Sequence, residues 1–222
     1  MEGSNLIKVE NTHIDNVVRA VYSARNAMNS WNKSDSDLET NTLGDNDLQL
    51  AKRLSKAGSD HRKYLRMINV TMDITAPLYW WKEFDTYKVG TVANSCSTMH
   101  KIAEKEFTLD DFSHEHLTLY DVDGEICRNW LGDLEDLIDD INLARELFIK
   151  TKDKKYWWQM IQLLPSSYNQ LRTVQLNYEV LYNIYNARKN HKLDEWHILC
   201  DSILQLPYFK EIFDIGELNA EN

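Results

Sequence analysis

One short segment carries most of the residue types that do nucleophilic chemistry or bind phosphate. It is KVGTVANSCSTMHKI, residues 88–102, and it includes Lys88, Cys96, Thr98 and His100. A cysteine close to a lysine and a histidine can be activated as a thiolate nucleophile. A small cysteine that only packs in the interior is the commoner role of this residue type. The segment therefore leaves both a reactive thiol and a packing residue open.

A second group of polar residues lies nearer the C-terminus. Asn177, Asn183 and Arg188 follow one another at spacings of six and five, downstream of the Leu-Pro pair at 164 and 165. Arginine pairs with phosphate oxygens through its planar fork, and an amide both donates and accepts hydrogen bonds. Structural roles are equally open, because the asparagines can serve helix packing and Arg188 can favour the dipole at a helix C-terminus.

The histidines are isolated in the sequence. His61, His100 and His197 could each act as a general acid or base, although a surface or core histidine is more common. The run His114-Glu115-His116 is too tightly spaced to place metal ligands on one helix face. The aromatic runs Tyr79-Trp80-Trp81 and Tyr156-Trp157-Trp158 could stack on a ring, but core or interface packing is favoured because adjacent side chains point apart.

The length and composition indicate a single mostly helical domain over residues 1–222. Hydrophobic residues make up 43% of the 222 residues, and only three Pro and seven Gly are present. This composition disfavours disorder and a turn-rich sandwich, and it favours long helices. We expect an α+β fold in which helices dominate and a small sheet is present.

Charge and cysteine content exclude several classes of function. A net charge of -10 opposes nonspecific binding to nucleic acid, so we expect no nucleic-acid partner. The three cysteines are widely spaced and form no CxxC, which disfavours a disulfide framework or a zinc site. No segment approaches the roughly 18 apolar residues of a membrane span, and no leader pattern is visible. We therefore expect a cytoplasmic protein with no membrane partner.

Periodicity predicts the elements that position these residues. We expect a strand at about 66–75, a loop at 32–44, and a cap for the second helix at Asp45. The helices are expected at 12–31, 45–58, 78–84, 131–151, 152–165, 166–188 and 192–205.

Several segments resemble one known family in the same order along the chain. NYEVLYNIYNAR at 177–188 resembles the C-terminal half of the flavin-dependent thymidylate synthases, the ThyX family, in which a Leu-Pro precedes similarly spaced asparagine and arginine residues. The segments DEWHI at 194–198, LPYFKEIF at 206–213 and VTMDITAPLYWWKEF at 70–84 resemble further parts of that family. The resemblance implies a helical domain around a small antiparallel sheet, assembled as a homotetramer with sites at subunit interfaces.

The family signature itself is largely replaced. The Arg-His-Arg triplet is Thr86, Tyr87 and Lys88, the serine is Cys96, and the arginine after it is Thr98. In addition, Met67 stands where the family has a histidine before the strand. The resemblance is therefore to a divergent member with a degenerate signature.

The resemblance implies a pyrimidine nucleotide such as dUMP as the partner, and FAD as the cofactor, with folate and NADPH as further candidates. Arg188, Lys88 and Thr98 would bind the nucleotide, Lys88, Asn177 and Asn183 the cofactor, and Cys96 and Arg188 would be catalytic. A thiolate at Cys96 could add to C6 of the pyrimidine. The function implied is one-carbon transfer to the nucleotide. The alternatives are an inactive nucleotide-binding or structural homo-oligomer of this fold, and an unrelated helical interaction protein.

Overall fold

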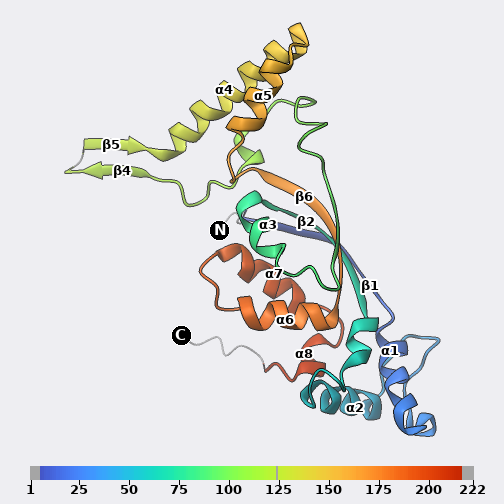
Figure 1. The fold of residues 1–222 in the computed structure, drawn as a ribbon. Helices are drawn as coiled ribbons and strands as arrows, with labels where there is room; N and C mark the ends of the chain where they lie inside the picture. The colour runs from blue at the N-terminus through green and yellow to red at the C-terminus, as the bar shows by residue number, and fades with distance from the viewer. Residues whose placement is uncertain (1–5, 124, 217–222) are drawn as a thin grey trace. The chain divides into compact units, whose positions relative to one another are not determined.

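The computed structural model describes residues 6–123 and 125–216, which form helices and a small antiparallel sheet (Figure 1). The helices are α1 Val17–Ser23, α2 Asp45–Lys56, α3 Leu78–Phe84, α4 Trp130–Thr151, α5 Lys154–Leu163, α6 Tyr178–Arg188, α7 Asp194–Leu204 and α8 Phe209–Phe213. The strands are β1 Lys8–Asp15, β2 Asn69–Pro77, β3 Val92–Ser95, β4 Leu119–Val122, β5 Glu125–Asn129 and β6 Asn169–Asn177. The α+β fold expected from the sequence is confirmed.

The chain divides into two compact units, each built from several segments. The α4 unit consists of Met1–Lys8, Ile74–Thr86 and Asn94–Arg172. The α6 unit consists of Val9–Asp73, Tyr87–Ala93 and Thr173–Asn222. That residues 1–222 act as one domain stays a prediction.

A four-stranded sheet with the order β1-β2-β6-β3 runs through both units. The chain passes between units at five points. Four of them lie one in each of these strands, after Lys8, Asp73, Ala93 and Arg172, and the fifth lies outside the sheet, after Thr86. The strand β2 alternates strictly, with Val70, Met72, Ile74 and Ala76 buried and the residues between them half-buried. This period of two is the pattern that β structure requires when one face is covered.

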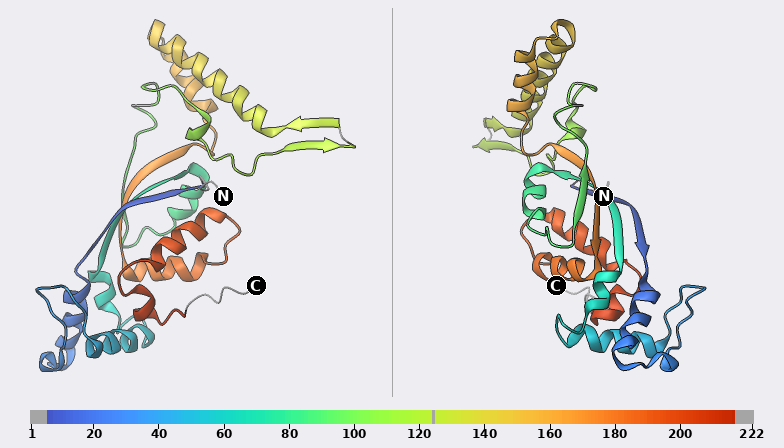
Figure 2. Two further views of the ribbon diagram at one scale, coloured as in Figure 1. Left: turned by 180° about the vertical axis from the view of Figure 1, so that it is seen from behind. Right: turned by 45° about the vertical axis from the view of Figure 1, so that its right-hand side comes forward.

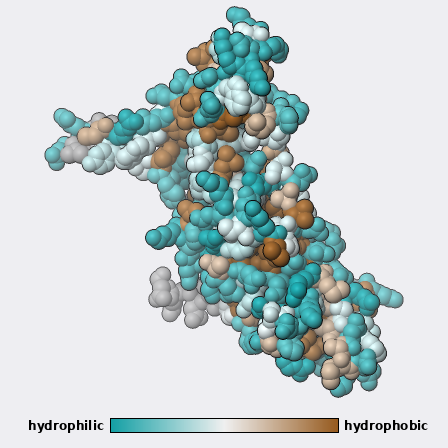
Figure 3. Space-filling view, in the orientation of Figure 1, coloured by the Kyte–Doolittle hydropathy of each residue, from teal (hydrophilic) through white to brown (hydrophobic). Residues whose placement is uncertain are grey.

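In the α4 unit, α4 and α5 form a helical hairpin, and the two helices lie side by side in both views of Figure 2. Their shared core also includes the segment 102–112, and its buried members are Ile102, Phe107, Phe112, Leu134, Ile138, Ile141, Ala144 and Met160. The strands β4 and β5 pair antiparallel and lead into α4, whose first turn is capped by Asn129 through the Gly132 amide at 3.0 Å. Exposed hydrophobic side chains remain on this hairpin, and brown surface is visible over it in Figure 3.

In the α6 unit, the helices α1, α2, α6, α7 and α8 pack on one another. The apolar faces of these helices are buried, as the amphipathic pattern of a surface helix requires. Their fully or nearly fully buried members include Val18, Val21, Ala51, Leu181, Ile184, Trp196, Leu199, Ile203, Phe209 and Ile212.

The strongly periodic helices agree with the expectations from the sequence. The helix expected at 131–151 is α4, and those expected at 78–84 and 192–205 are α3 and α7. Likewise, α5 ends at Leu163, two residues before Pro165, as the missing amide of a proline predicts.

Three expectations about local structure are wrong. The helix expected at 166–188 is strand β6 followed by α6, because Gln170, Val174 and Leu176 are buried on one side of a strand. The helix expected at 12–31 is also wrong, because β1 continues to Asp15 and α1 begins only at Val17. Finally, Gly44 and not Asp45 occupies the cap position of α2.

None of the helices in residues 6–123 and 125–216 combines the length and the apolar character needed to cross a bilayer.

Candidate functional site

The loop Tyr87–Ala93, which contains Tyr87 and Lys88 of the altered signature, lies against the start of α6. Gly90 has a positive φ of 77°, and a Cβ placed there would lie 3.0 Å from Asn177 Nδ2 and 3.3 Å from Val180 Cγ2. Glycine is therefore suited to this turn both in backbone conformation and in the space available. The loop therefore lies close to the first turn of α6 at Gly90.

Asn177 ends β6 and caps α6. Its Oδ1 accepts a hydrogen bond from the Val180 amide at 3.1 Å, which satisfies one of the unpaired amides of the first turn. The sequence placed Asn177 and Asn183 on one helix; Asn177 instead precedes it, and Asn183 lies exposed on α6. The Asn177 amide group thus has a structural role, and its Nδ2 faces Gly90.

Arg188 is half-buried and is held by two aromatic rings. Its Nε donates to the Tyr87 hydroxyl at 2.9 Å. Its guanidinium carbon lies 4.6 Å from the ring centre of Trp196 and 5.7 Å from that of Tyr87. Cation–π contacts of this kind fix the orientation of a guanidinium as well as stabilising it. Arg188 is therefore a positioned cation at the end of α6, next to the loop that carries Lys88.

Lys88 follows Tyr87 directly and has an exposed side chain. Its carbonyl accepts a long backbone hydrogen bond from Thr91 at 3.4 Å, which closes the turn that contains Gly90. Four residues of interest belong to the α6 unit: Lys88, Asn177, Asn183 and Arg188. Asn177 and Arg188 lie at opposite ends of α6.

Cys96 and Thr98 belong to the α4 unit. The Cys96 amide donates to the Leu171 carbonyl at 2.9 Å, and its carbonyl accepts from Gln170 Nε2 at 2.7 Å. The Cys96 side chain is exposed, and no described residue forms a hydrogen bond with its sulfur. Thr98 is half-buried. The backbone at Cys96 is therefore fixed, whereas the thiol is accessible and is not oriented by a base.

Arg172 was not singled out from the sequence. Its guanidinium carbon lies 4.4 Å from the ring centre of Trp81, and its Nη1 lies 3.0 Å from an Asp85 carboxylate oxygen. Its Nε donates to Gln170 Oε1 at 3.0 Å. The contact between residues 170 and 172 is natural in a strand, where side chains two apart share a face. We expected a helix for this segment, and residues two apart do not face each other on a helix, so this contact was not predicted.

The isolated histidines do not form a catalytic or metal cluster in the described parts of the chain. His100 is exposed, and His197 Nε2 is 2.8 Å from the His191 carbonyl oxygen. His61 is exposed near α2. No group of three or more His, Cys, Asp or Glu side chains there is arranged to hold a metal ion. Among the aromatic runs, Trp80 and Trp81 are fully buried, whereas Trp158 is partly exposed.

The α+β arrangement, with helices around a small antiparallel sheet, is that of the flavin-dependent thymidylate synthases. The chain is similar to thymidylate synthase X from Helicobacter pylori, solved with FAD and dUMP, at a TM-score of 0.65 and 17% identity over 94% of this chain and 96% of that one. A second structure of the Helicobacter pylori enzyme with the same ligands gives a TM-score of 0.66 at 17% identity, over 94% of this chain and 97% of that one.

A UMP/dUMP methylase, PolB from Streptomyces cacaoi, bound with 5-Br dUMP, is similar at a TM-score of 0.58 and 14% identity, over 88% of this chain and 87% of that one. The sequence matches no protein-family model and no curated protein sequence. The structural likeness confirms the ThyX-like fold, and the low identity fits a divergent relative.

Proposed function

We propose that this protein binds a pyrimidine nucleotide such as dUMP at the loop Tyr87–Ala93 and the C-terminal end of α6. The observation that carries the proposal is the positioned guanidinium of Arg188, held by Tyr87 and Trp196. A fixed guanidinium loses little conformational freedom when it pairs with a phosphate. The similar structures contain dUMP or 5-Br dUMP, which supports this class of ligand.

Lys88 supplies the second cation of the proposed site. It is exposed and directly follows Tyr87, the residue that holds Arg188. An ammonium on a flexible stem can follow a phosphate as a point charge, whereas Arg188 provides the directional contact. Thr98 and Cys96 remain candidate substrate and catalytic residues, and nothing in the geometry of the Cys96 thiol favours nucleophilic attack over a passive role.

The residues of the α6 unit fit a flavin nucleotide in part. Lys88 and Asn183 are exposed and would hold polar groups of FAD, while Asn177 would contribute only through Nδ2 because its oxygen caps α6. A bound flavin would supply hydride transfer. The residues of this chain would bind the dinucleotide, and one exposed lysine in place of two arginines makes its pyrophosphate less well neutralised.

One-carbon transfer to the bound nucleotide, with folate as carbon donor and NADPH as reductant, is the finer proposal. It rests on the fold and on the ligands of the similar structures. A nucleotide-binding protein without this reaction is the second candidate, and it is favoured by the replacement of the signature by Thr86, Tyr87 and Lys88.

A homotetramer is also proposed, because the fold resembles that family and apolar side chains remain exposed on the α4–α5 hairpin. The exposed members are Leu143, Ile149, Trp158 and Leu163. Exposed apolar groups that gather on one element are typical of interaction surfaces.

Calorimetric titration of the purified protein with dUMP tests the nucleotide site. We expect binding that weakens at least tenfold in Arg188→Gln and less in Tyr87→Phe, which removes only one hydrogen bond to Arg188. Lys88→Ala should also weaken binding, whereas Lys192→Ala, which removes an exposed lysine elsewhere in the α6 unit, serves as the control. Equal affinity of wild type and Arg188→Gln for dUMP would refute the proposed site.

The visible absorbance of added FAD tests the cofactor separately. A shifted flavin spectrum on binding, lost in Lys88→Ala, would support the flavin enzyme. Binding of dUMP with an unchanged flavin spectrum would assign the chain to the second candidate, a nucleotide-binding protein without flavin chemistry.

A further inference from the structure

A cavity of about 880 Å³ lies beside α2 within the α6 unit. One wall is a stripe of α2 made by Asn46, Gln49, Leu50, Arg53 and Leu54, which recur at intervals of three and four residues. Residues at this spacing share one helix face. The other wall comes from residues between Ala24 and Lys33. The volume lies in the range of about 300–1,000 Å³ that is usual for small-molecule sites.

The charge of this cavity is opposite to that of the chain. Arg25, Lys33, Arg53 and His61 line it, and no Asp or Glu is found among its described lining residues. The whole chain has 35 acidic and 25 basic residues. Because Arg25 is paired with the buried Asp47, the positive charge that this cavity offers to anions comes from Lys33 and Arg53, and it raises the local concentration of anions.

Two of these cations have no ion-pair partner in the described residues. Lys33 and Arg53 are exposed and form no salt bridge there. Other cations of the same unit are paired, for example Lys56 with Asp214 at 2.6 Å and Arg62 with Glu179 at 3.0 Å. The charges of Lys33 and Arg53 are therefore not neutralised by an ion pair with a described carboxylate and remain available to an anion.

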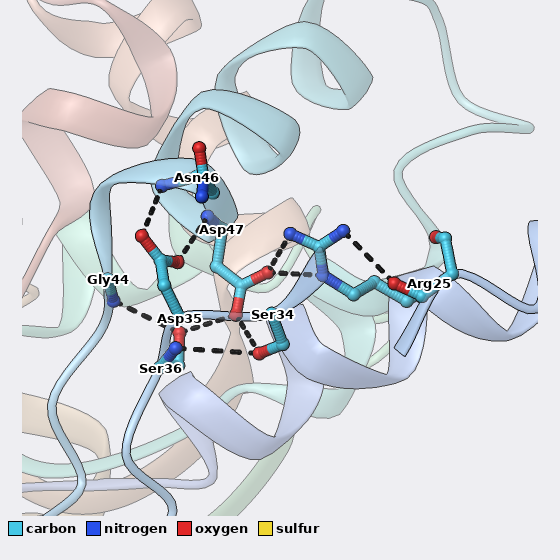
Figure 4. Close-up of polar contacts among 8 residues, drawn as sticks. Arg25, Ser34, Asp35, Ser36, Gly44, Asn46 and Asp47 are labelled. Carbon is cyan, nitrogen blue, oxygen red and sulfur yellow. Dashed lines mark hydrogen bonds and ion pairs between the residues drawn. The ribbon is translucent and has the colours of Figure 1, made fainter. Parts of the chain in front are cut away.

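A buried ion pair fixes the two walls to each other (Figure 4). Arg25 is 5% exposed, and its Nη2 and Nε both lie 2.5 Å from one oxygen of Asp47, which is fully buried on α2. The other Asp47 oxygen accepts hydrogen bonds from the Ser34 and Ser36 hydroxyls at 2.5 Å. A satisfied network of this kind makes the local structure rigid. The cavity that holds Lys33 and Arg53 is therefore preorganised.

The rest of the lining consists of the polar residues Ser30, Asn46 and Gln49 and of an apolar part. Ala24, Ala27, Leu50 and Leu54 contribute to it, and Met28 at its edge is 82% exposed. An apolar wall facing cations suits a ligand that has a ring at one end and phosphate at the other.

We propose that this cavity is a second binding site, for a small organic phosphate, with Lys33 and Arg53 contacting the phosphate and the Ala27–Leu54 wall covering the ring. None of these residues takes part in the proposed dUMP site, so the two proposals stand or fall separately. Binding should weaken with added salt, because exposed cations are screened.

Calorimetric titration with ADP, and with inorganic pyrophosphate as the ring-free probe, tests the second site. We expect ADP to bind more tightly than pyrophosphate, and to bind at least tenfold more weakly to K33A/R53A. The control, K150A/K192A, also removes two exposed basic side chains, here both lysines, and should bind ADP as the wild type does. Arg53→Gln alone gives a milder variant, and circular dichroism verifies that each variant is folded.

Three outcomes would overturn the second site. They are the absence of ADP binding, the same ADP affinity in wild type and K33A/R53A, and an equal loss in K150A/K192A. The variant Lys88→Ala separates the two sites, since it should lose dUMP affinity and keep ADP affinity. Loss of ADP affinity in Lys88→Ala but not in K33A/R53A would assign the ADP to the proposed dUMP site instead.

Discussion

At the scale of single residues, the three cysteines differ in environment. Cys96 and Cys127 are exposed, whereas Cys200 is buried in α7. Burial raises the pKa of the Cys200 thiol to about 12, with the neighbouring Asp201 as a smaller cause. Because the thiolate is the reactive form, the chemistry of this chain's cysteines is confined to Cys96 and Cys127.

Thiol titration at mildly alkaline pH tests this difference. We expect two fast-reacting thiols in the native protein and three after denaturation, because Cys200 is both inaccessible and almost wholly protonated. Cys200→Ser should leave the count of fast thiols unchanged, and Cys96→Ser should lower it by one. Rapid reaction of all three thiols in the folded protein would contradict the buried position of Cys200.

The Arg25–Asp47 pair gives a second prediction at the residue scale. Arg25→Met leaves the fully buried Asp47 carboxylate without its cation, so we expect the free energy of unfolding to fall by about 3–5 kcal/mol. The double variant R25M/D47L removes both charges and should recover much of that loss. Denaturant unfolding measures the free energy of unfolding of both variants. A double variant less stable than Arg25→Met would show that the unpaired charge of Asp47 does not cause the loss.

At the scale of the elements, α2 is capped from outside its own sequence. Asp35 accepts hydrogen bonds from the Asn46 amide at 2.8 Å and the Asp47 amide at 3.1 Å. A Cβ on Gly44, the cap position, would lie 2.4 Å from Asp35 Cγ and 2.5 Å from the Asp35 carbonyl oxygen. Gly44 is needed because only glycine lets the Asp35 backbone approach this closely.

This cap predicts a pH dependence. The Asn46 amide, chiefly, lowers the pKa of Asp35 below its usual value. A carboxylate with a lowered folded-state pKa stabilises the fold above its unfolded pKa of about 3.9, and that stabilisation disappears as the pH falls through the folded-state value. Asp35→Ala should therefore lower the free energy of unfolding by about 1 kcal/mol near neutral pH.

The difference between wild type and Asp35→Ala should begin to shrink below about pH 4, where Asp35 is protonated in the unfolded state. It should reach its minimum once the pH is below the folded-state pKa, because Asp35 is then protonated in both states. Urea unfolding of both proteins across the acidic range measures it. If the difference in free energy of unfolding stays constant at the lowest pH measured, the charge of Asp35 does not contribute to the stability of the fold. Glu39→Ala, which removes an exposed carboxylate of the same loop that accepts no hydrogen bond from the described residues, is the control.

How much of the molecule could be predicted from sequence also depends on the element. Long amphipathic helices such as α4 were predicted because their apolar residues recur with one period over many turns. The strand β6 was missed because Leu171, Val174 and Leu176 suit a helix as well as a strand, and the buried polar Gln170 gives no periodic signal. The short strands β3, β4 and β5 were missed because four or five residues carry too little pattern.

The candidate site was predictable only as a set of residues. Arg188 was identified from its spacing, but its partner Tyr87 lies 101 positions away and Trp196 lies on another helix. The cavity lined by Lys33 and Arg53 was not predicted. These two residues are far apart in the sequence, and they line one cavity because the Arg25–Asp47 pair holds their segments together. Tertiary contacts of this kind leave no local signal.

At the scale of the whole molecule, the exposed face of the α4–α5 hairpin predicts self-association. We expect sedimentation to show a tetramer for the wild type and a smaller species for Trp158→Glu and Leu143→Glu, because a charge on an apolar interface is costly to desolvate. Lys150→Ala, which changes an exposed lysine on α4, should leave the sedimenting mass of the assembly unchanged. A monomer in the wild type would refute the proposed assembly.

The four-stranded sheet also has a consequence for how the protein is made. The chain passes between its compact units five times, four of them inside a strand of that sheet, so neither unit is a continuous stretch of sequence. The ribosome must therefore synthesise β6, at residues 169–177, before β2 and β3 can pair with it and complete the sheet. Folding should be slow for a chain this rich in helices, because pairings between distant segments carry a large loop-closure entropy. Until β6 is made, the edge of β2 that pairs with it stays exposed, so we expect nascent chains of this protein to benefit from a chaperone that shields strand edges.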